Sequence, residues 1–323
     1  MPNHLRVESI EAAAELIDPA FRNTPQFTDA SLSRRIGREL VVKLETCNPI
    51  RSFKGRGADY YMRDVASDQE VVCASAGNFG QAIAYTARAR GIEVTVFSAR
   101  NANPVKVARM KELGATVIPA GEDFDAAKTA ARAYADERAG RLFVEDGDEP
   151  RIAEGAGTIA VELVKARPDV VLVPVGNGAL IGGIGCWMKT RAPRTRIVGV
   201  CAANAPAMAR SWRRGAAVAT ATARTIADGV AVRLPVPAAV EAMRAYVDDV
   251  ELVEEDDIRE ALRVVRDTMG LLLEPAGALG IAAAMRSDRD RGLTTATIVT
   301  GSNFSEDLLA ELVGVPSPVR PVG

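Results

Sequence analysis

The chain has 323 residues, long enough for about two domains of ordinary size, and it is 48% hydrophobic and 25% charged, as ordinary globular proteins are. Its 40 Lys and Arg nearly balance its 42 Asp and Glu, so the whole molecule has no field that would recruit nucleic acid or an anionic membrane. The composition therefore favours a small molecule as the partner.

Two stretches bear on where the protein works. The N-terminal "MPNHLRVESIEAAAELI" carries Glu8 and Glu11 early and lacks the basic start and unbroken apolar core of a secretory signal. Residues 170–188 carry no charge, but they contain Pro174, Asn177 and five glycines, which suits a strand and a loop better than a lipid-facing helix. We expect a cytoplasmic protein without a membrane span.

The cysteines and the histidine exclude several kinds of site. Cys47, Cys73, Cys186 and Cys201 are far apart and form no CxxC, so neither a disulfide framework nor a zinc site is indicated. The one histidine, His4, lies near the start of the chain. A Ser-His-Asp triad, a Cys-His pair and an HExxH metal site are therefore all excluded.

Short runs rich in β-branched residues recur along the chain and are apolar at nearly every position, as in strands covered on both faces. They lie at residues 39–44, 93–97, 115–120, 169–175, 196–200 and 296–300. Helical patterns lie between most of them, among them "FGQAIAYTARARG" and "NPVKVARMKELG". This alternation predicts an α/β fold with mainly parallel open sheets flanked by helices.

Glycine-marked loops after strands are the candidate sites, because ligands of α/β proteins bind past the carboxyl ends of strands. The first loop, Ser75-Ala76-Gly77-Asn78, follows the strand in "VVCASAGNFGQAIAY" and enters a helix. Its backbone N–H groups could hold a carboxylate or a phosphate. The alternative is a plain strand-to-helix turn with Asn78 as the N-cap.

The second loop, Gly176-Asn177-Gly178, follows a strong strand and also enters a helix, so its backbone can approach an anion closely. A dinucleotide fingerprint would need glycine where Ile181 stands, and the acid that grips a ribose is missing downstream. The loop therefore suits a monophosphate better than a dinucleotide.

Two further positions follow the same logic. Glu274 precedes Pro275 at a predicted helix start, where a carboxylate could face a ligand or simply favour the helix N-terminus. Thr300 ends the last predicted strand, where its hydroxyl could meet a ligand atom or satisfy local backbone.

A lysine, Lys54, lies among small residues in "SFKGRGA", and a lysine acts covalently when its amine condenses with an aldehyde. Pyridoxal phosphate is the cofactor that needs such an amine together with one phosphate cradle. "SFKGRGA", "SAGNFGQA", "PVGNGALIGG", "TIADGVAVR", "EPAGALG" and "TGSN" follow the order and spacing of fold type II pyridoxal phosphate enzymes. From about Thr24 to the C-terminal helix the chain resembles the threonine/serine dehydratases and serine racemases of that fold type.

The resemblance implies a role for each matching position. Lys54 is implied as the Schiff-base lysine and as the base that takes the substrate's α-proton, with Phe53 packed on the cofactor ring. Further cofactor contacts are implied for Asn78 at the ring hydroxyl, Glu274 at the pyridine edge, Thr300 at the ring nitrogen, and Gly176, Asn177, Gly178, Ala179 and Leu180 at the phosphate. The substrate carboxylate is implied to bind at Ser75, Ala76, Gly77 and Asn78.

The implied chemistry is α,β-elimination. A neutral hydroxyl at the ring nitrogen cannot keep that nitrogen protonated as a carboxylate would, so the ring is a weaker electron sink. Expulsion of a β leaving group needs that sink less than a long-lived carbanion does. We expect an ammonia-lyase that removes water from L-threonine, L-serine or an analogue and yields a 2-oxo acid and ammonia.

Some positions depart from the family pattern. Racemases of the family place a serine before the Gly-Asn of the substrate loop, where this chain has Ala76, so racemisation should be poor. Relatives that bind a cation use acids where this chain has Cys201 and Ala207, so no metal is expected. Phe79 replaces the histidine common after the loop asparagine, which leaves the substrate open.

Two alternatives remain. The stretch "NPIRSFK" resembles threonine synthases and cysteine synthases, which favours β-replacement, with Arg51 and Arg56 binding an anionic leaving group unless they form ion pairs. A non-catalytic protein that binds pyridoxal phosphate is the other. The resemblance further implies a large cofactor-binding domain of residues 1–67 and 146–323, a small domain of residues 68–145, no C-terminal regulatory domain, and a homodimer.

Overall fold

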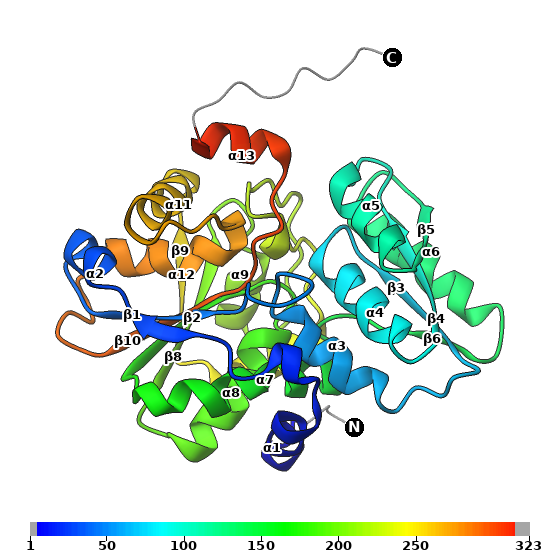
Figure 1. The fold of residues 1–323 in the computed structure, drawn as a ribbon, viewed down its shortest axis with the longest axis horizontal. Helices are drawn as coiled ribbons and strands as arrows, with labels where there is room; N and C mark the ends of the chain where they lie inside the picture. The colour runs from blue at the N-terminus through cyan, green and yellow to red at the C-terminus, as the bar shows by residue number, and fades with distance from the viewer. Residues whose placement is uncertain (1–4, 314–323) are drawn as a thin grey trace.

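The computed structural model describes residues 5–313, so His4 lies outside the described residues. Two sheets lie side by side, the larger at the left of Figure 1 and the smaller at the right. The larger has the order β1-β2-β10-β7-β8-β9. Its strands are β1 (Gln26–Thr28), β2 (Leu40–Leu44), β7 (Val170–Pro174), β8 (Arg196–Ala202), β9 (Asp249–Val253) and β10 (Thr295–Val299).

The smaller sheet has the order β5-β4-β3-β6. Its strands are β3 (Glu70–Ala74), β4 (Glu93–Ser98), β5 (Thr116–Pro119) and β6 (Arg141–Phe143). Every neighbouring pair in both sheets is parallel except β1 with β2. The predicted α/β class with mainly parallel sheets is therefore confirmed.

Helices cover both faces of each sheet, as parallel sheets require. The helices are α1 (Val7–Leu16), α2 (Ala30–Ile36), α3 (Lys54–Met62), α4 (Asn78–Arg88), α5 (Pro104–Glu112), α6 (Phe124–Asp136), α7 (Pro150–Leu163), α8 (Ala179–Arg191), α9 (Ala207–Arg214), α10 (Pro237–Tyr246), α11 (Glu255–Met269), α12 (Pro275–Arg286) and α13 (Glu306–Val313), with short 3₁₀ turns η1 (Pro19–Phe21), η2 (Val164–Ala166) and η3 (Asp228–Val230). Within residues 5–313 no helix is long and apolar enough to cross a bilayer.

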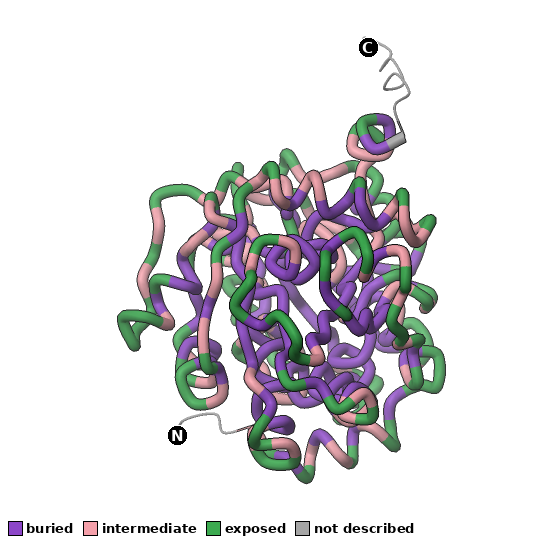
Figure 2. The backbone as a smooth tube through the Cα atoms, turned by 90° about the vertical axis from the view of Figure 1, so that its left-hand side faces the viewer, coloured by how far each residue is buried: buried purple, intermediate pink, exposed green. Residues whose placement is uncertain are grey.

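Each sheet has a core on both faces. One face of the larger sheet packs on α1, α7, α8, α9 and α10, and the opposite face packs on α2, α11 and α12. The smaller sheet packs on α3, α4 and α5 at one face and on α6 at the other. Figure 2 shows the buried segments gathered inside and the exposed ones in the outer turns. The two sheets support a two-domain division, whose boundaries at residues 67/68 and 145/146 stay a prediction.

Each of the six predicted strand runs overlaps an observed strand, from β2 to β10. Of the strands the sequence does not predict, β1 and β6 have only three residues each, and the half-exposed "DVELV" of β9 lies at the edge of its sheet. Short or half-exposed strands lack the continuous apolar run on which the prediction depends.

Candidate active site

One cavity of about 390 Å³ opens between the two sheets. All the predicted site residues line it: Phe53, Lys54, Ser75, Ala76, Gly77, Asn78, Gly176, Asn177, Gly178, Ala179, Leu180, Glu274 and Thr300. They come together because β3, β7 and β10 all end at this cleft, and ligands of α/β proteins bind at the carboxyl ends of parallel strands. The individual roles assigned to these residues remain predictions.

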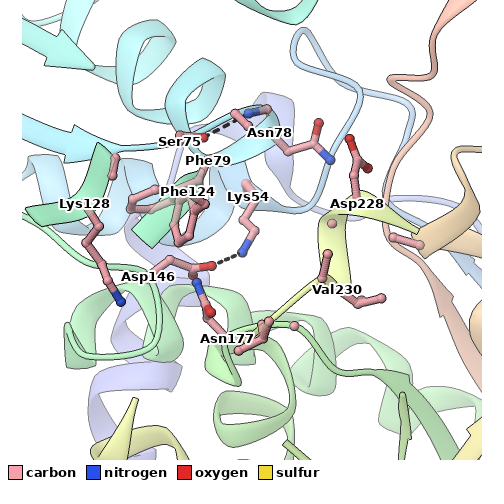
Figure 3. Close-up of a pocket in the computed structure, with 18 of the residues that line it drawn as sticks. Lys54, Ser75, Asn78, Phe79, Phe124, Lys128, Asp146, Asn177, Asp228 and Val230 are labelled. Carbon is pink, nitrogen blue, oxygen red and sulfur yellow. Dashed lines mark hydrogen bonds and ion pairs between the residues drawn. The ribbon is translucent and has the colours of Figure 1, made fainter. Parts of the chain in front are cut away.

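Lys54 is the first residue of α3 and points into the cavity (Figure 3). Its Nζ forms an ion pair with Asp146 and lies 4.7 Å from the centroid of the Phe53 ring and 5.8 Å from that of Phe79. Aromatic faces attract a cation at such distances. The Phe53 N–H donates to the Thr300 carbonyl at 3.0 Å, which ties the start of α3 to the end of β10.

The loop ahead of Lys54 is held by Asn48. Its Oδ1 accepts from the Ile50 and Ser52 N–H groups at 3.1 and 3.3 Å, and its Nδ2 donates to the Glu45 and Ser52 carbonyls at 2.9 and 3.1 Å. The Asn-Pro step therefore has a local structural role.

Neither arginine of this segment reaches the cavity. Arg51 is exposed, with a φ of 52°. Arg56 is 0% exposed and bonded to Glu45 and Glu162. The idea that they bind an anionic leaving group is wrong, because the cavity lining includes neither.

The loop Ser75–Asn78 is organised by a hydroxyl. The Ser75 Oγ accepts from the N–H groups of Gly77 and Gly80 at 3.1 and 2.9 Å and so caps the start of α4. Gly77 is the N-cap residue, and it has no side chain to cap with. Asn78 is therefore not the N-cap, and the alternative of a plain turn capped by Asn78 is wrong.

Asn78 turns its amide toward two other segments. Its Nδ2 donates to Glu274 Oε1 at 2.6 Å, and its Oδ1 accepts from Asn303 Nδ2 at 2.9 Å. Glu274 precedes α12 but makes no side-chain cap there, and its carboxylate faces the cavity instead. A Cβ on Gly301 would lie 2.0 Å from Glu274 Oε1, so this carboxylate fits only because residue 301 is glycine.

The Glu274 carboxyl is 1% exposed, and burial raises its pKa to about 7 even though the Lys106 ammonium opposes that rise. Lys106, on α5, places Nζ 4.0 Å from Glu274 Oε2 and 2.5 Å from Asp228 Oδ2. Both Lys106 and Asp228 line the cavity. The charges at this end of the cavity thus come from three separate segments.

The loop before α8 is a glycine cradle. Gly178 is the N-cap of α8 with a φ of 92° and offers no side-chain cap. A Cβ on Gly176 would lie 2.6 Å from the Gly229 carbonyl oxygen, and a Cβ on Gly178 would lie 2.8 Å from Ala239. The first N–H groups of a helix have no intrahelical partner, so an uncapped N-terminus facing a cavity is a ready phosphate site.

Sequence reasoning missed seven charged residues of this cavity: Asp228, Lys106 and Asp146, and also Asp125, Lys128, Glu145 and Arg233. Asp228 lies in "TIADGVAVR", a motif that was recognised but given no residue role. Lys106 lies in a helix whose sequence gives no sign of a site. Asp146 follows the short strand β6, which the sequence does not predict, so nothing marked it as lying past a strand end.

Comparison with known proteins identifies the class. Residues 17–301 match the model of the pyridoxal-phosphate dependent enzyme family. The chain is 33% identical to the L-threonine ammonia-lyase of Thermotoga maritima over 96% of this chain and 78% of that protein. It belongs to the pyridoxal-phosphate dependent enzyme family.

Solved structures show which members of the family this chain resembles. The processed threonine deaminase isoform 2 from Solanum lycopersicum superposes with a TM-score of 0.87 at 27% identity, covering 97% of this chain and 92% of that one. Maize serine racemase superposes with a TM-score of 0.87 at 26% identity, covering 96% and 97%. The resemblance to the threonine/serine dehydratases and serine racemases of fold type II is confirmed, and so is the cofactor.

The residues present fit that cofactor. A phosphate suits the uncapped N-terminus of α8, and the Lys54 amine lies in the same cavity. Two buried carboxylate oxygens of the cavity, Asp146 Oδ1 and Glu274 Oε2, have no hydrogen-bond partner among the described residues. Such oxygens indicate a cavity built to hold a polar ligand.

Proposed function

We propose that this enzyme is an ammonia-lyase that removes water from a 3-hydroxy amino acid such as L-threonine or L-serine and yields a 2-oxo acid and ammonia. One observation carries the proposal. The Lys54 amine lies in a cavity bounded by two helix N-termini, that of α4, which Ser75 caps, and that of α8, which has no side-chain cap. The first suits the substrate carboxylate and the second suits the phosphate.

Bound pyridoxal phosphate supplies an electron sink for the substrate's α-carbon. The Lys54 amine takes the α-proton, and Ser75 with the backbone of Ala76 and Gly77 orients the carboxylate. Thr300 lines the cavity and is neutral, so it would not hold a ring nitrogen protonated as a carboxylate would, which favours elimination over a long-lived carbanion. Asn78, Phe53 and Glu274 would contact the ring of the cofactor, and the segment 176–180 would hold its phosphate.

Ala76 separates this chain from the racemases. It lines the cavity and carries no acid or base, so a proton removed by Lys54 has no donor at this position that could return it from the opposite face. Elimination from one face is therefore favoured over racemisation. Arg56 is buried and Arg51 lies outside the cavity, so neither arginine supports β-replacement with an anionic leaving group.

The proposal also covers the domain arrangement, the oligomeric state and the location of the enzyme. The cofactor lies between a small domain of residues 68–145 and a large domain of residues 1–67 and 146–323, whose closure excludes water from the reaction. The enzyme works in the cytoplasm as a homodimer. No metal is needed at Cys201 and Ala207, whose side chains cannot supply the oxygen ligands of a hard cation.

The test is oxo acid formation by the cofactor-loaded enzyme from L-serine and L-threonine, with and without added sulfide. We expect oxo acid in both cases, in equal amounts. A β-replacement enzyme would lose most of its oxo acid when sulfide is present. A non-catalytic binding protein would show a visible cofactor band that borohydride abolishes and no oxo acid from either amino acid.

A further inference from the structure

Lys106 is a buried cation that lies against the loop proposed to bind the substrate carboxylate. Its side chain is 7% exposed, and it lines the cavity. A Cβ built on Gly77 would lie 3.3 Å from Lys106 Cδ and 3.6 Å from Nζ, so the end of the lysine lies next to Gly77. Figure 3 shows Asn78, the next residue of the loop, on the same side of the cavity as Asp228, the acid that pairs with this lysine.

The loop by itself offers an anion only neutral groups. Residues 75–78 carry no charge. The Ser75 Oγ already accepts from the N–H groups of Gly77 and Gly80, at 3.1 and 2.9 Å, so two donors at the start of α4 are used within the protein. A carboxylate held by the remaining N–H groups would keep its full charge in a largely buried place, where a nearby cation stabilises it.

Lys106 differs from the other cations of the cavity in the exposure of its acid. Asp228 Oδ2 lies 2.5 Å from Lys106 Nζ, but the side chain of Asp228 is 55% exposed. Among the described residues that line the cavity, each of the other three cations pairs with an acid whose side chain is at most 15% exposed: Lys54 with Asp146, Lys128 with Glu145 and Arg233 with Asp125. An exposed acid regains water when its ion pair breaks, so such a pair is readily exchanged.

The second acid near Lys106 does not replace Asp228 as its counter-ion. Glu274 Oε2 lies 4.0 Å from Lys106 Nζ and has no hydrogen-bond partner among the described residues. Burial raises the pKa of Glu274 to about 7, so this carboxyl takes up a proton near neutral pH. Lys106 is therefore a buried cation that needs an anion, and the protein supplies that anion from a solvent-exposed side chain.

We propose that Lys106 binds the α-carboxylate of the substrate, which displaces Asp228 as the anion beside the ammonium. The inference rests on the proposed function, since it assumes that this carboxylate binds at residues 75–78. It adds a charged binding residue to a loop of neutral groups, and it makes Asp228 a competitor of the substrate. A ligand without a carboxylate should be indifferent to both residues.

The first experiment measures whether Lys106 recognises the carboxylate. The absorbance of cofactor-loaded enzyme is titrated with L-alanine, which has no leaving group, and with L-alaninamide, which lacks the carboxylate. Lys106→Met keeps most of the side-chain length and removes its charge. We expect it to weaken L-alanine binding about 30-fold and to change L-alaninamide binding less than about 3-fold. Equal losses for both ligands would overturn the proposal, because a structural defect does not distinguish them.

Substitution of Asp228 should have the opposite effect. Asp228→Asn removes the competing anion, so L-alanine should bind about 3-fold more tightly, while L-alaninamide binding should stay the same. In the Lys106→Met background the same substitution should change neither affinity, because no cation remains to be released. Weaker L-alanine binding in Asp228→Asn would overturn the exchange. If Lys106→Met fails to fold, Asp228→Asn decides alone, and an unchanged affinity for L-alanine would contradict the proposal.

Lys128→Met is the matched control. Lys128 lines the same cavity, and its acid Glu145 keeps Arg132 at 2.9 Å when the lysine is removed. We expect a change of less than about 3-fold for either ligand. A loss confined to L-alanine in this variant as well would show that any cation of the cavity has the same effect, and would overturn the assignment to Lys106.

Steady-state kinetics with L-serine give a second readout. A residue that holds the carboxylate equally in the substrate and in the transition state affects KM alone. Lys106→Met should therefore raise KM about 30-fold and leave kcat within about 3-fold of wild type. A fall in kcat with an unchanged KM would assign Lys106 to the chemical step and contradict the inference.

Failure of this inference and failure of the proposed function can be told apart, because the titrations need no turnover. A selective loss of L-alanine binding in Lys106→Met, in an enzyme that forms no oxo acid from L-serine or L-threonine, supports the role of Lys106 and overturns water elimination. Oxo acid from L-serine together with equal losses for both ligands overturns the inference and leaves the ammonia-lyase function standing.

Discussion

Lys54 and Arg56 lie two positions apart on α3, yet their surroundings differ. The Arg56 guanidinium donates to Glu45 at 2.7 and 2.9 Å, to Glu162 at 2.8 and 3.1 Å, to Thr158 at 2.9 Å and to Thr24 at 3.2 Å. Within residues 5–313, Lys54 has one ionic partner, Asp146, and it faces a cavity. The protein therefore satisfies the charge and the N–H donors of Arg56, whereas Lys54 has a single acidic partner and remains open to a ligand.

The difference distinguishes charged groups that stabilise the fold from charged groups that are available for binding and catalysis. Around Arg56, the cations of Arg56 and Lys43 lower the pKa of Glu162 to about 2 although burial opposes that shift. In the cavity, burial instead raises the pKa of Glu274 to about 7. A buried charge whose hydrogen bonds are complete stabilises the fold, whereas one left incomplete is available to a ligand.

The largest expected effect comes from removing Lys54, the cation that faces the cavity. Lys54→Ala should lower kcat by about 10⁴-fold or more, because both the covalent attachment and the proton acceptor are lost. The measurement is oxo acid formation by cofactor-loaded protein, together with borohydride fixation of the cofactor. Lys54→Arg keeps a cation beside Asp146 and should be equally inactive but fold normally. Activity within about 10-fold of wild type in Lys54→Ala would remove Lys54 from the mechanism.

Removing the matched cation should damage stability instead. Arg56→Met leaves the buried Glu45 without a cation and Glu162 with Lys43 alone, and it should lower the free energy of unfolding by about 3–5 kcal/mol. Urea denaturation measures this. The double variant that adds only Glu45→Gln removes the stranded charge, leaves Glu162 paired with Lys43 at 2.5 Å, and should recover much of the loss. A cost below about 1 kcal/mol for Arg56→Met would show that the network does not stabilise the fold.

The raised pKa of Glu274 predicts a pH-dependent free energy of unfolding. Its pKa in the folded protein, about 7, lies above the unfolded value of 4.5, so its contribution to stability is present below pH 4.5 and is lost as the pH rises through 7. In cofactor-free protein, Glu274→Gln should add about 3 kcal/mol to the free energy of unfolding at pH 8.5 relative to wild type, and almost nothing at pH 4.5. Urea unfolding at both pH values measures it. The same increment at both would place the pKa of Glu274 near its ordinary value.

Substitution of Ser75 should give the smallest effect, and it should change both stability and KM. Ser75→Ala removes the cap of α4 and should cost about 1 kcal/mol of stability, while its lost contact to the substrate carboxylate should raise KM about 10-fold. Asp29→Ala is the matched control, since Asp29 caps α2 by accepting from the Leu32 N–H at 2.7 Å outside the cavity lining. It should cost similar stability and leave KM unchanged. An unchanged KM in Ser75→Ala as well would leave Ser75 with the capping role alone.

The fold and half of the site were predictable because their signals are local. Apolar runs located the strands, and the glycines of the segment 176–178 indicated a phosphate cradle before any contact was known. The wrong assignments had the opposite cause. Asn78 was weighed as an N-cap on local grounds, but its amide bonds to Glu274, 196 residues away. Arg56 was weighed as a ligand residue, but its partner Glu162 is 106 residues away.

The sequence by itself determined which side chain can act covalently and which backbone segments can hold anions, since a lysine amine and a glycine-rich helix start have that chemistry in any setting. Only the tertiary structure decided which charges are matched. In the sequence Asp146 is not distinguishable from other loop aspartates, and folding brings it into contact with Lys54, which is 92 residues away. Whether a carboxylate is paired depends on distances and burial, and those are set by the packing of segments that are remote in the chain.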